Sequence, residues 1–122
     1  MLHLAIGRSG FTWMIAEPPD NLWGIVDLAG GMQVRISPKV PCGYMLDVIN
    51  YEWIHTRQYA KYGNRTIQAY GDGLEPVADC GSRLLGSTYT PYLGLRGSGC
   101  TEYERASARS LLGSTTGGKA PC

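Results

Sequence analysis

Two short segments of the chain carry side chains that could bind a metal ion and move a proton. In the first, Tyr51-Glu52-Trp53-Ile54-His55, a carboxylate and an imidazole stand three residues apart. In the second, Glu75-Pro76-Val77-Ala78-Asp79, two carboxylates stand four residues apart. Imidazole nitrogen and carboxylate oxygen are common zinc ligands, and a carboxylate beside a metal-bound water can act as a general base. Together the segments indicate a zinc hydrolase site with one ligand altered.

Helical spacing within the first segment supports a shared site. Positions 51 and 55 are four residues apart, so in a helix they lie about 40° apart around the axis, one above the other. Both side chains would therefore face a common point. A helix over 44–62 would carry them, and a second helix over 74–85 would carry the later carboxylates.

These residues resemble the zincin metallopeptidases, whose signature is HExxH, and among them the gluzincins, in which ExxxD follows on a later helix. The resemblance implies that Glu52 is the catalytic general base and that His55 and Glu75 are metal ligands. It also implies that Asp79 is the carboxylate behind the ligands that orients the first histidine of the motif. Tyr51 stands where that first histidine is expected.

A longer run, from Pro41-Cys42 through Asp47-Val48 to Gln58, is similar to small HEWxHxQ proteins of actinobacteria and their phages. This similarity covers roughly residues 32–112 and implies a minimal zincin-like domain. It also implies an extracellular or virion-associated protein. By the same resemblance, Met32–Ile36 would be the edge strand that receives an extended substrate.

Tyr51 decides between two states of the site. A catalytic zinc usually takes three protein ligands and a water, and a phenol ligates only after losing a proton whose ordinary pKa is near 10. In the first state Tyr51, His55 and Glu75 bind zinc, and Glu52 takes a proton from the metal-bound water and returns it to the leaving amine. In the second, which we favour, the Tyr51 hydroxyl donates to Asp79 and zinc is weakly bound or absent.

Simpler interpretations exist for each segment taken alone. Glu52 and His55 could be an ordinary polar pair on a solvated helix face, which contributes only tenths of a kcal/mol. Glu75 and Asp79 could be acids favoured near a helix N-terminus by the helix dipole. The other imidazole, His3, is predicted to be a surface residue rather than a replacement ligand.

Residues 1–37 are predicted to form short strands, because β-branched and aromatic residues alternate there with turn signals. The four candidate strands are Leu2–Ile6, Phe11–Ala16, Leu22–Leu28 and Met32–Ile36. The Gly30-Gly31 turn favours antiparallel pairing. The whole pattern predicts a single α+β domain over 1–122, with a small antiparallel sheet packed on the motif helix and two further helices.

The helix boundaries follow from capping signals. Gly63 ends the helix over 44–62, Asp72 and Glu75 resemble a capping box for the helix over 74–85, and Thr101 with Glu104 predicts another for the helix over 101–112. The remaining segments are a stiff connector over 37–43, a polar loop over 63–73, a long connection over 86–99 and a tail over 113–122.

The four cysteines predict two disulfides, because an even number in a small glycine-rich chain is typical of secreted scaffolds. They are Cys42, Cys80, Cys100 and Cys122. We favour a Cys42–Cys80 bond, since Cys42 precedes the motif helix and Cys80 directly follows Asp79. Buried free thiols are the alternative, and Cys122 could form an intermolecular bond.

Charge and composition exclude some partners. The net charge is +1, with acids and bases well mixed, so the sequence predicts neither nucleic-acid nor membrane binding. Met1–Ile6 reaches Gly7 too soon for a signal peptide, so either the protein is not exported by that route or the numbered chain lacks its leader. Eight tyrosines and three tryptophans suit a contact surface for a protein or peptide, or for self-association.

The sequence therefore predicts a degenerate metallopeptidase-like protein with weak or no peptidase activity, whose scaffold serves binding or structure. The alternatives are an active zinc peptidase and a phage or secreted structural protein that self-assembles. Metal content and chelator-sensitive cleavage would separate the first two, and sedimentation would test the third.

Overall fold

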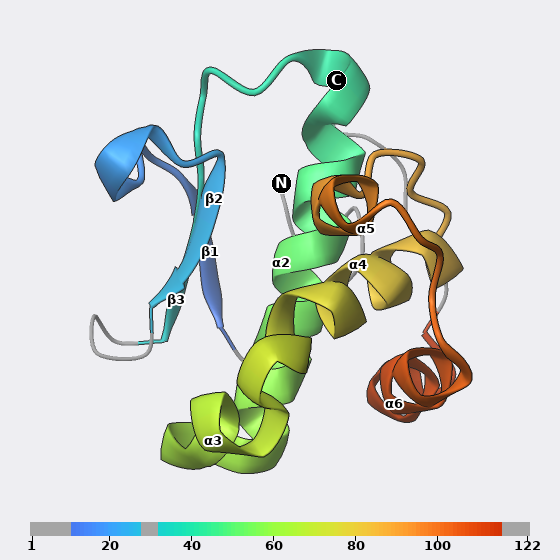
Figure 1. Ribbon diagram of the computed structural model, residues 1–122. Helices are drawn as coiled ribbons and strands as arrows, with labels where there is room; N and C mark the ends of the chain where they lie inside the picture. The colour runs from blue at the N-terminus through green and yellow to red at the C-terminus, as the bar shows by residue number, and fades with distance from the viewer. Residues whose placement is uncertain (1–10, 28–31, 116–122) are drawn as a thin grey trace.

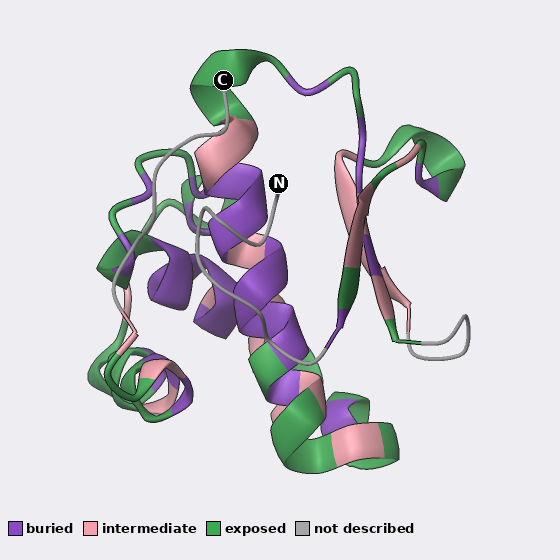
Figure 2. Cartoon of the chain, turned by 180° about the vertical axis from the view of Figure 1, so that it is seen from behind, coloured by how far each residue is buried: buried purple, intermediate pink, exposed green. Residues whose placement is uncertain are grey.

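A single long helix, α2 (Cys42–Tyr62), lies between a small sheet on one side and the other helices on the other side (Figure 1). The computed structural model describes residues 11–27 and 32–115. Val48 and Ile49 of α2 pack in the cluster that faces the sheet, whereas Trp53 and Ile54 pack in the helical cluster. Because both faces are covered, the middle of α2 is buried (Figure 2). The motif of residues 51–58 therefore lies in the interior.

The predicted α+β class is confirmed, but the sheet is mixed rather than antiparallel. Its three strands are β1 (Thr12–Ile15), β2 (Gly24–Asp27) and β3 (Gln33–Ile36). Their order is β1-β3-β2, with β2 antiparallel and β1 parallel to β3. A short turn, η1 (Pro19–Asn21), lies between β1 and β2 in the sequence. The two strands do not pair with each other, because β3 lies between them in the sheet. The predicted strand Leu2–Ile6 and the Gly30-Gly31 turn lie outside the described residues.

The prediction that Met32–Ile36 is an edge strand is wrong. β3 is the central strand, and its Val34 and Ile36 are completely buried. The edge strand that meets the candidate site is β2. A Cβ atom on Gly24 would lie 2.7 Å from the Oε2 atom of Glu52, so β2 approaches α2 closely because this position has no side chain.

The helices match the predicted ones closely, and two short ones were missed. α2 begins at Cys42, two residues before the predicted start at residue 44. Pro41 is its N-cap, and a proline is tolerated there because the first N–H groups of a helix have no partner within the helix. It ends at Gly63 in the positive-φ region, as predicted. The 63–73 loop contains η2 (Gly63–Arg65), α3 (Thr66–Tyr70) and η3 (Gly71–Gly73), and the 86–99 connection contains α5 (Pro91–Arg96).

The two remaining helices are α4 (Leu74–Leu84) and α6 (Glu102–Leu112). The capping box of α6 is confirmed, because Thr101 Oγ1 accepts from Glu104 N at 3.1 Å and Glu104 Oε1 accepts from Thr101 N at 2.9 Å. The box predicted for α4 is wrong. Its N-cap is Gly73, which has no side chain to accept a bond, and the carboxylate of Glu75 is engaged with α2 instead.

The predicted Cys42–Cys80 bond is also wrong, since Cys80 is bonded to Cys100 with their Cα atoms 6.0 Å apart. α4 crosses α2 near Ile54, where a Cβ on Gly81 would meet Ile54 Cδ1 at 2.6 Å. Cys42 is twelve residues earlier along α2, roughly 18 Å of helix, and a disulfide spans Cα atoms less than about 7 Å apart. The observed bond fastens α4 to the start of α6, and Cys122 lies outside the described residues.

Among residues 11–27 and 32–115, no helix combines the length and the apolar character that crossing a bilayer would need.

Candidate functional site

Glu75, in the first turn of α4, connects the two segments that the sequence singled out. Its Oε1 atom accepts a hydrogen bond from the Tyr51 hydroxyl at 2.5 Å and lies 2.8 Å from His55 Nε2. Tyr51 and His55 come from one face of α2, as their spacing predicted. The structure therefore brings together a phenol, an imidazole and a carboxylate on a single oxygen atom.

Both ring nitrogens of His55 face acceptors. Nδ1 lies 2.6 Å from Oε1 of Gln58, whose Nε2 atom donates to the backbone oxygen of Leu74 at 3.1 Å. The second nitrogen, Nε2, faces the Glu75 carboxylate. Each nitrogen needs a proton to donate, so this geometry favours the imidazolium form. His55 and Glu75 then form a charge-assisted hydrogen bond.

The pKa shifts of Glu75 and His55 both favour the charged form of the side chain. Burial alone would raise the pKa of Glu75, but hydrogen bonds from His55 and Tyr51 and the charge of His55 lower that pKa to about 2. Burial alone would lower the pKa of His55, yet the bond to Glu75 and the negative charges of Glu52 and Glu75 raise it. Both shifts favour the ionised form of the His55–Glu75 pair.

Tyr51 is held as a neutral phenol. Burial, followed by the negative charge of Glu75, raises its pKa far above the ordinary value. Its ring stacks on Tyr92 with centroids 5.8 Å apart and planes 9° apart, and it meets the ring of His55 edge-on at 4.6 Å. The prediction that Tyr51 donates to Asp79 is wrong, because the carboxylate within reach of its hydroxyl is Glu75.

Asp79 has a different role from the one implied by the resemblance. Its Oδ2 atom accepts backbone N–H bonds from Tyr92 at 2.7 Å and Leu93 at 3.1 Å. These N–H groups belong to the first turn of α5, where helical N–H groups lack partners within the helix. Asp79 therefore anchors α5 to α4, and it places the Tyr92 ring against Tyr51.

Glu52 is buried and carries a carboxylate that the charge of His55 stabilises only partly. The residue is 5% exposed, and within residues 11–27 and 32–115 its carboxylate makes no hydrogen bond or ion pair. Burial raises the pKa of Glu52 to about 7, opposed by the charge of His55 and assisted by that of Glu75. The carboxylate lies against the backbone of Gly24 in β2.

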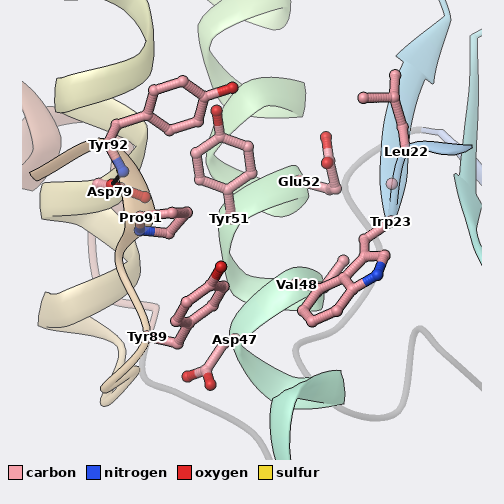
Figure 3. Close-up of a pocket in the computed structure, with 11 residues that line it drawn as sticks. Leu22, Trp23, Asp47, Val48, Tyr51, Glu52, Asp79, Tyr89, Pro91 and Tyr92 are labelled. Atoms are coloured by element: carbon pink, nitrogen blue, oxygen red, sulfur yellow. Dashed lines mark hydrogen bonds between the residues drawn. The ribbon is translucent and has the colours of Figure 1, made fainter. Parts of the chain in front are cut away.

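A cleft of about 220 Å³ runs beside these residues, between α2, the start of β2 and the segment before α5 (Figure 3). A second hollow of about 200 Å³ continues it toward His55 and Glu75. The two hollows share five wall residues: Leu22, Gly24, Tyr51, Glu52 and Tyr92. Figure 3 shows the Glu52 side chain extending from α2 into the space that faces Leu22.

The donor set does not fit a tightly held zinc ion. Two zinc ligands in tetrahedral geometry lie about 3.3 Å apart, given metal–ligand bonds of about 2.0–2.2 Å, whereas His55 Nε2 and Glu75 Oε1 are at the hydrogen-bond distance of 2.8 Å. Tyr51 offers a neutral phenol, which leaves two ordinary ligands. Within residues 11–27 and 32–115, no group of three or more His, Cys, Asp or Glu residues is placed to hold a metal.

No protein-family model, curated protein or solved structure matches the chain. The likeness to zincins remains a prediction that depends on residues 51–58 and 75–79.

Two residues of the site were missed by the sequence analysis. Gly24 interrupts a strand pattern directly after Trp23, and such a glycine indicates close approach of another group, so a signal was available. Tyr92 carried no signal, because its place beside Tyr51 depends on how Asp79 holds α5.

Proposed function

We propose that this chain is a non-catalytic, peptide-binding domain on a metallopeptidase-like scaffold. The observation that carries the proposal is the double use of Glu75 Oε1, which accepts from Tyr51 and pairs with His55. In a zincin those positions would be metal ligands. Here the phenol and the imidazolium satisfy the carboxylate directly, which gives a closed hydrogen-bond network at the catalytic position.

Binding is the use that this arrangement leaves available. The cleft beside Glu52 remains open, and its walls include the rings of Trp23, Tyr89 and Tyr92. Aromatic residues of this kind are enriched where proteins contact partners. A peptide could therefore occupy the cleft without being cleaved.

One observation favours the competing function, an active peptidase. The pKa of Glu52 is raised to about 7 by burial, and a general base works best when its pKa is close to the working pH. The same burial also accounts for this pKa in a site that performs no catalysis, so the distinction has to come from metal content and cleavage.

The test is zinc uptake and peptidase activity in the wild type, Tyr51→His and Tyr51→Phe. After equilibration with excess zinc and gel filtration, the wild type and Tyr51→Phe should retain well under one zinc per chain. Tyr51→His should gain zinc affinity by at least about 100-fold, since it supplies a third ordinary ligand. Unfolded casein should not be cut by the wild type, with or without chelator. A stoichiometric zinc and chelator-sensitive cleavage by the wild type would overturn the proposal.

A further inference from the structure

The carboxylate of Glu52 lies in the cleft but takes no part in the hydrogen-bond network of Tyr51, His55 and Glu75. A buried ionised group without hydrogen bonds or a counter-charge costs several kcal/mol, so native structures usually pair such groups. Glu75, on α4, is hydrogen-bonded by Tyr51, Tyr92 and His55. Glu52 makes no hydrogen bond or salt bridge within residues 11–27 and 32–115, although the charge of His55 acts on it. Its side chain extends into the cleft (Figure 3). A cation that enters the cleft could therefore pair with this carboxylate.

The walls of the cleft determine the charge of that partner. Three carboxylates line the cleft, those of Asp47, Glu52 and Asp79, and among residues 11–27 and 32–115 no lysine or arginine lines it with them. Asp47 and Asp79 each use one oxygen on backbone N–H groups, Asp47 on Thr88 at 3.1 Å. A cation entering the cleft therefore meets an excess of negative charge, whereas an anion would be repelled.

Two arginines of the described residues are engaged elsewhere, Arg83 and Arg57. Arg83, which acts on Asp79 electrostatically, has its Nε atom bonded to Thr90 at 3.1 Å. Arg57 lies over the ring of Trp53, on the opposite face of α2 from the cleft. Neither guanidinium lines the cleft.

The aromatic walls favour a planar cation. Tyr51 and Tyr92 are stacked nearly parallel on one side. Trp23 from the β2 side and Tyr89 from the opposite side approach to 6.0 Å between centroids, and Tyr44 contacts both rings, at 5.5 and 5.0 Å, so these rings close one end. Guanidinium groups stack on aromatic faces and pair with carboxylates through two parallel bonds, and they are desolvated more easily than ammonium groups. The volume of about 220 Å³ suits one long side chain rather than a folded element.

We propose that the cleft binds the side chain of an arginine in a partner peptide, with the Glu52 carboxylate as its ion-pair partner. This rests on the proposed function and adds the class of partner. Gly24 leaves room for the Glu52 carboxylate in this position, because a Cβ atom there would lie 2.7 Å from Glu52 Oε2 and displace it.

The test uses three tripeptides, acetyl-Gly-X-Gly-amide with arginine, lysine or citrulline at X, titrated into isotopically labelled protein and followed by amide and Trp23 indole shifts. Citrulline has the shape of arginine without the charge. The arginine peptide should bind at least about tenfold more tightly than the citrulline peptide, as expected for a charge paired at a partly buried site. It should also bind more tightly than the lysine peptide.

Three variants test whether the preference for arginine over citrulline depends on Glu52. Glu52→Gln should remove the preference for arginine over citrulline, and Gly24→Ala should weaken it. Glu102→Gln, which removes one negative charge from an exposed position on α6, should leave it unchanged. Equal binding of arginine and citrulline, or an unaltered preference in Glu52→Gln, would overturn the inference. Equal binding of lysine would overturn the assignment to arginine. Zinc uptake is measured separately, so either proposal can fail alone.

Discussion

Two glutamates of the same site have opposite environments. Glu75 has two partners on one oxygen and a pKa lowered to about 2. Glu52 is more deeply buried, has no hydrogen-bond partner among the described residues, and has a pKa raised to about 7. Burial acts on both carboxylates in the same direction. The difference therefore comes from the supply of hydrogen-bond donors, because Tyr51, Tyr92 and His55 all donate to Glu75.

This contrast separates a closed part of the site from an open part. Around Glu75 the polar groups satisfy one another, and the positions that would hold zinc in a zincin form a network. The Glu52 carboxylate instead faces the cleft, where a ligand can reach it. Each of the following substitutions acts on one side of the contrast.

The largest effect is expected from Glu52→Gln. The folded state holds the Glu52 proton up to about pH 7, whereas the unfolded chain loses it near its ordinary pKa of about 4.3. Between these values the folded state binds more protons, so stability of the wild type falls as pH rises through this window. Glutamine carries no such proton. The variant should therefore match the wild type at pH 4 and exceed it by about 3 kcal/mol at pH 8.

Urea unfolding at the two pH values measures this difference, with Glu102→Gln as the control that should change stability by less than about 0.5 kcal/mol. A Glu52→Gln variant that is no more stable than the wild type at pH 8 would mean that Glu52 has a partner after all.

The next effect is expected from Glu75→Gln, which removes the counter-charge of His55. The side chains of the pair are 10% and 36% exposed for His55 and Glu75, so we expect a loss of about 2 kcal/mol at pH 7 rather than the larger cost of a fully buried pair. The pKa of His55 should fall at the same time. Urea unfolding and the proton shifts of the imidazole measure the two changes, and an unchanged pKa of His55 would contradict the ion pair.

A smaller effect is expected from Tyr51→Phe, which keeps the stack on Tyr92 and removes one hydrogen bond to Glu75. The expected loss is about 1.5 kcal/mol, at the low end of the range for a hydrogen bond to a charged group. The pKa of Glu75 should rise toward its ordinary value. If the variant is as stable as the wild type and leaves that pKa unaltered, the hydroxyl does not serve Glu75.

The sequence predicted much of this arrangement because local rules determine it. The helix face that holds Tyr51 and His55 follows from their four-residue spacing, and the end of α2 at Gly63 and the capping box at Thr101 follow from short-range chemistry. The meeting of Glu75 with His55 depended on the ExxxD spacing of the zincin resemblance.

What the sequence could not predict depends on how elements cross. The central place of β3, the Cys80–Cys100 bond and the use of Asp79 by α5 all follow from where the elements cross and meet in three dimensions. Likewise, Tyr51 was expected to bond to Asp79, because nothing in the spacing distinguishes two carboxylates one helical turn apart. α5 decides between them by occupying Asp79 with its own N–H groups.

The central claim is that donors, rather than depth of burial, separate the two glutamates. Carbon-detected NMR of the side-chain carboxyl groups, titrated from pH 2 to pH 9 in metal-free protein, measures both pKa values in one experiment. The account predicts that Glu75 titrates near 2 and Glu52 near 7. Equal pKa values for the two groups, or a higher pKa for Glu75 than for Glu52, would contradict it.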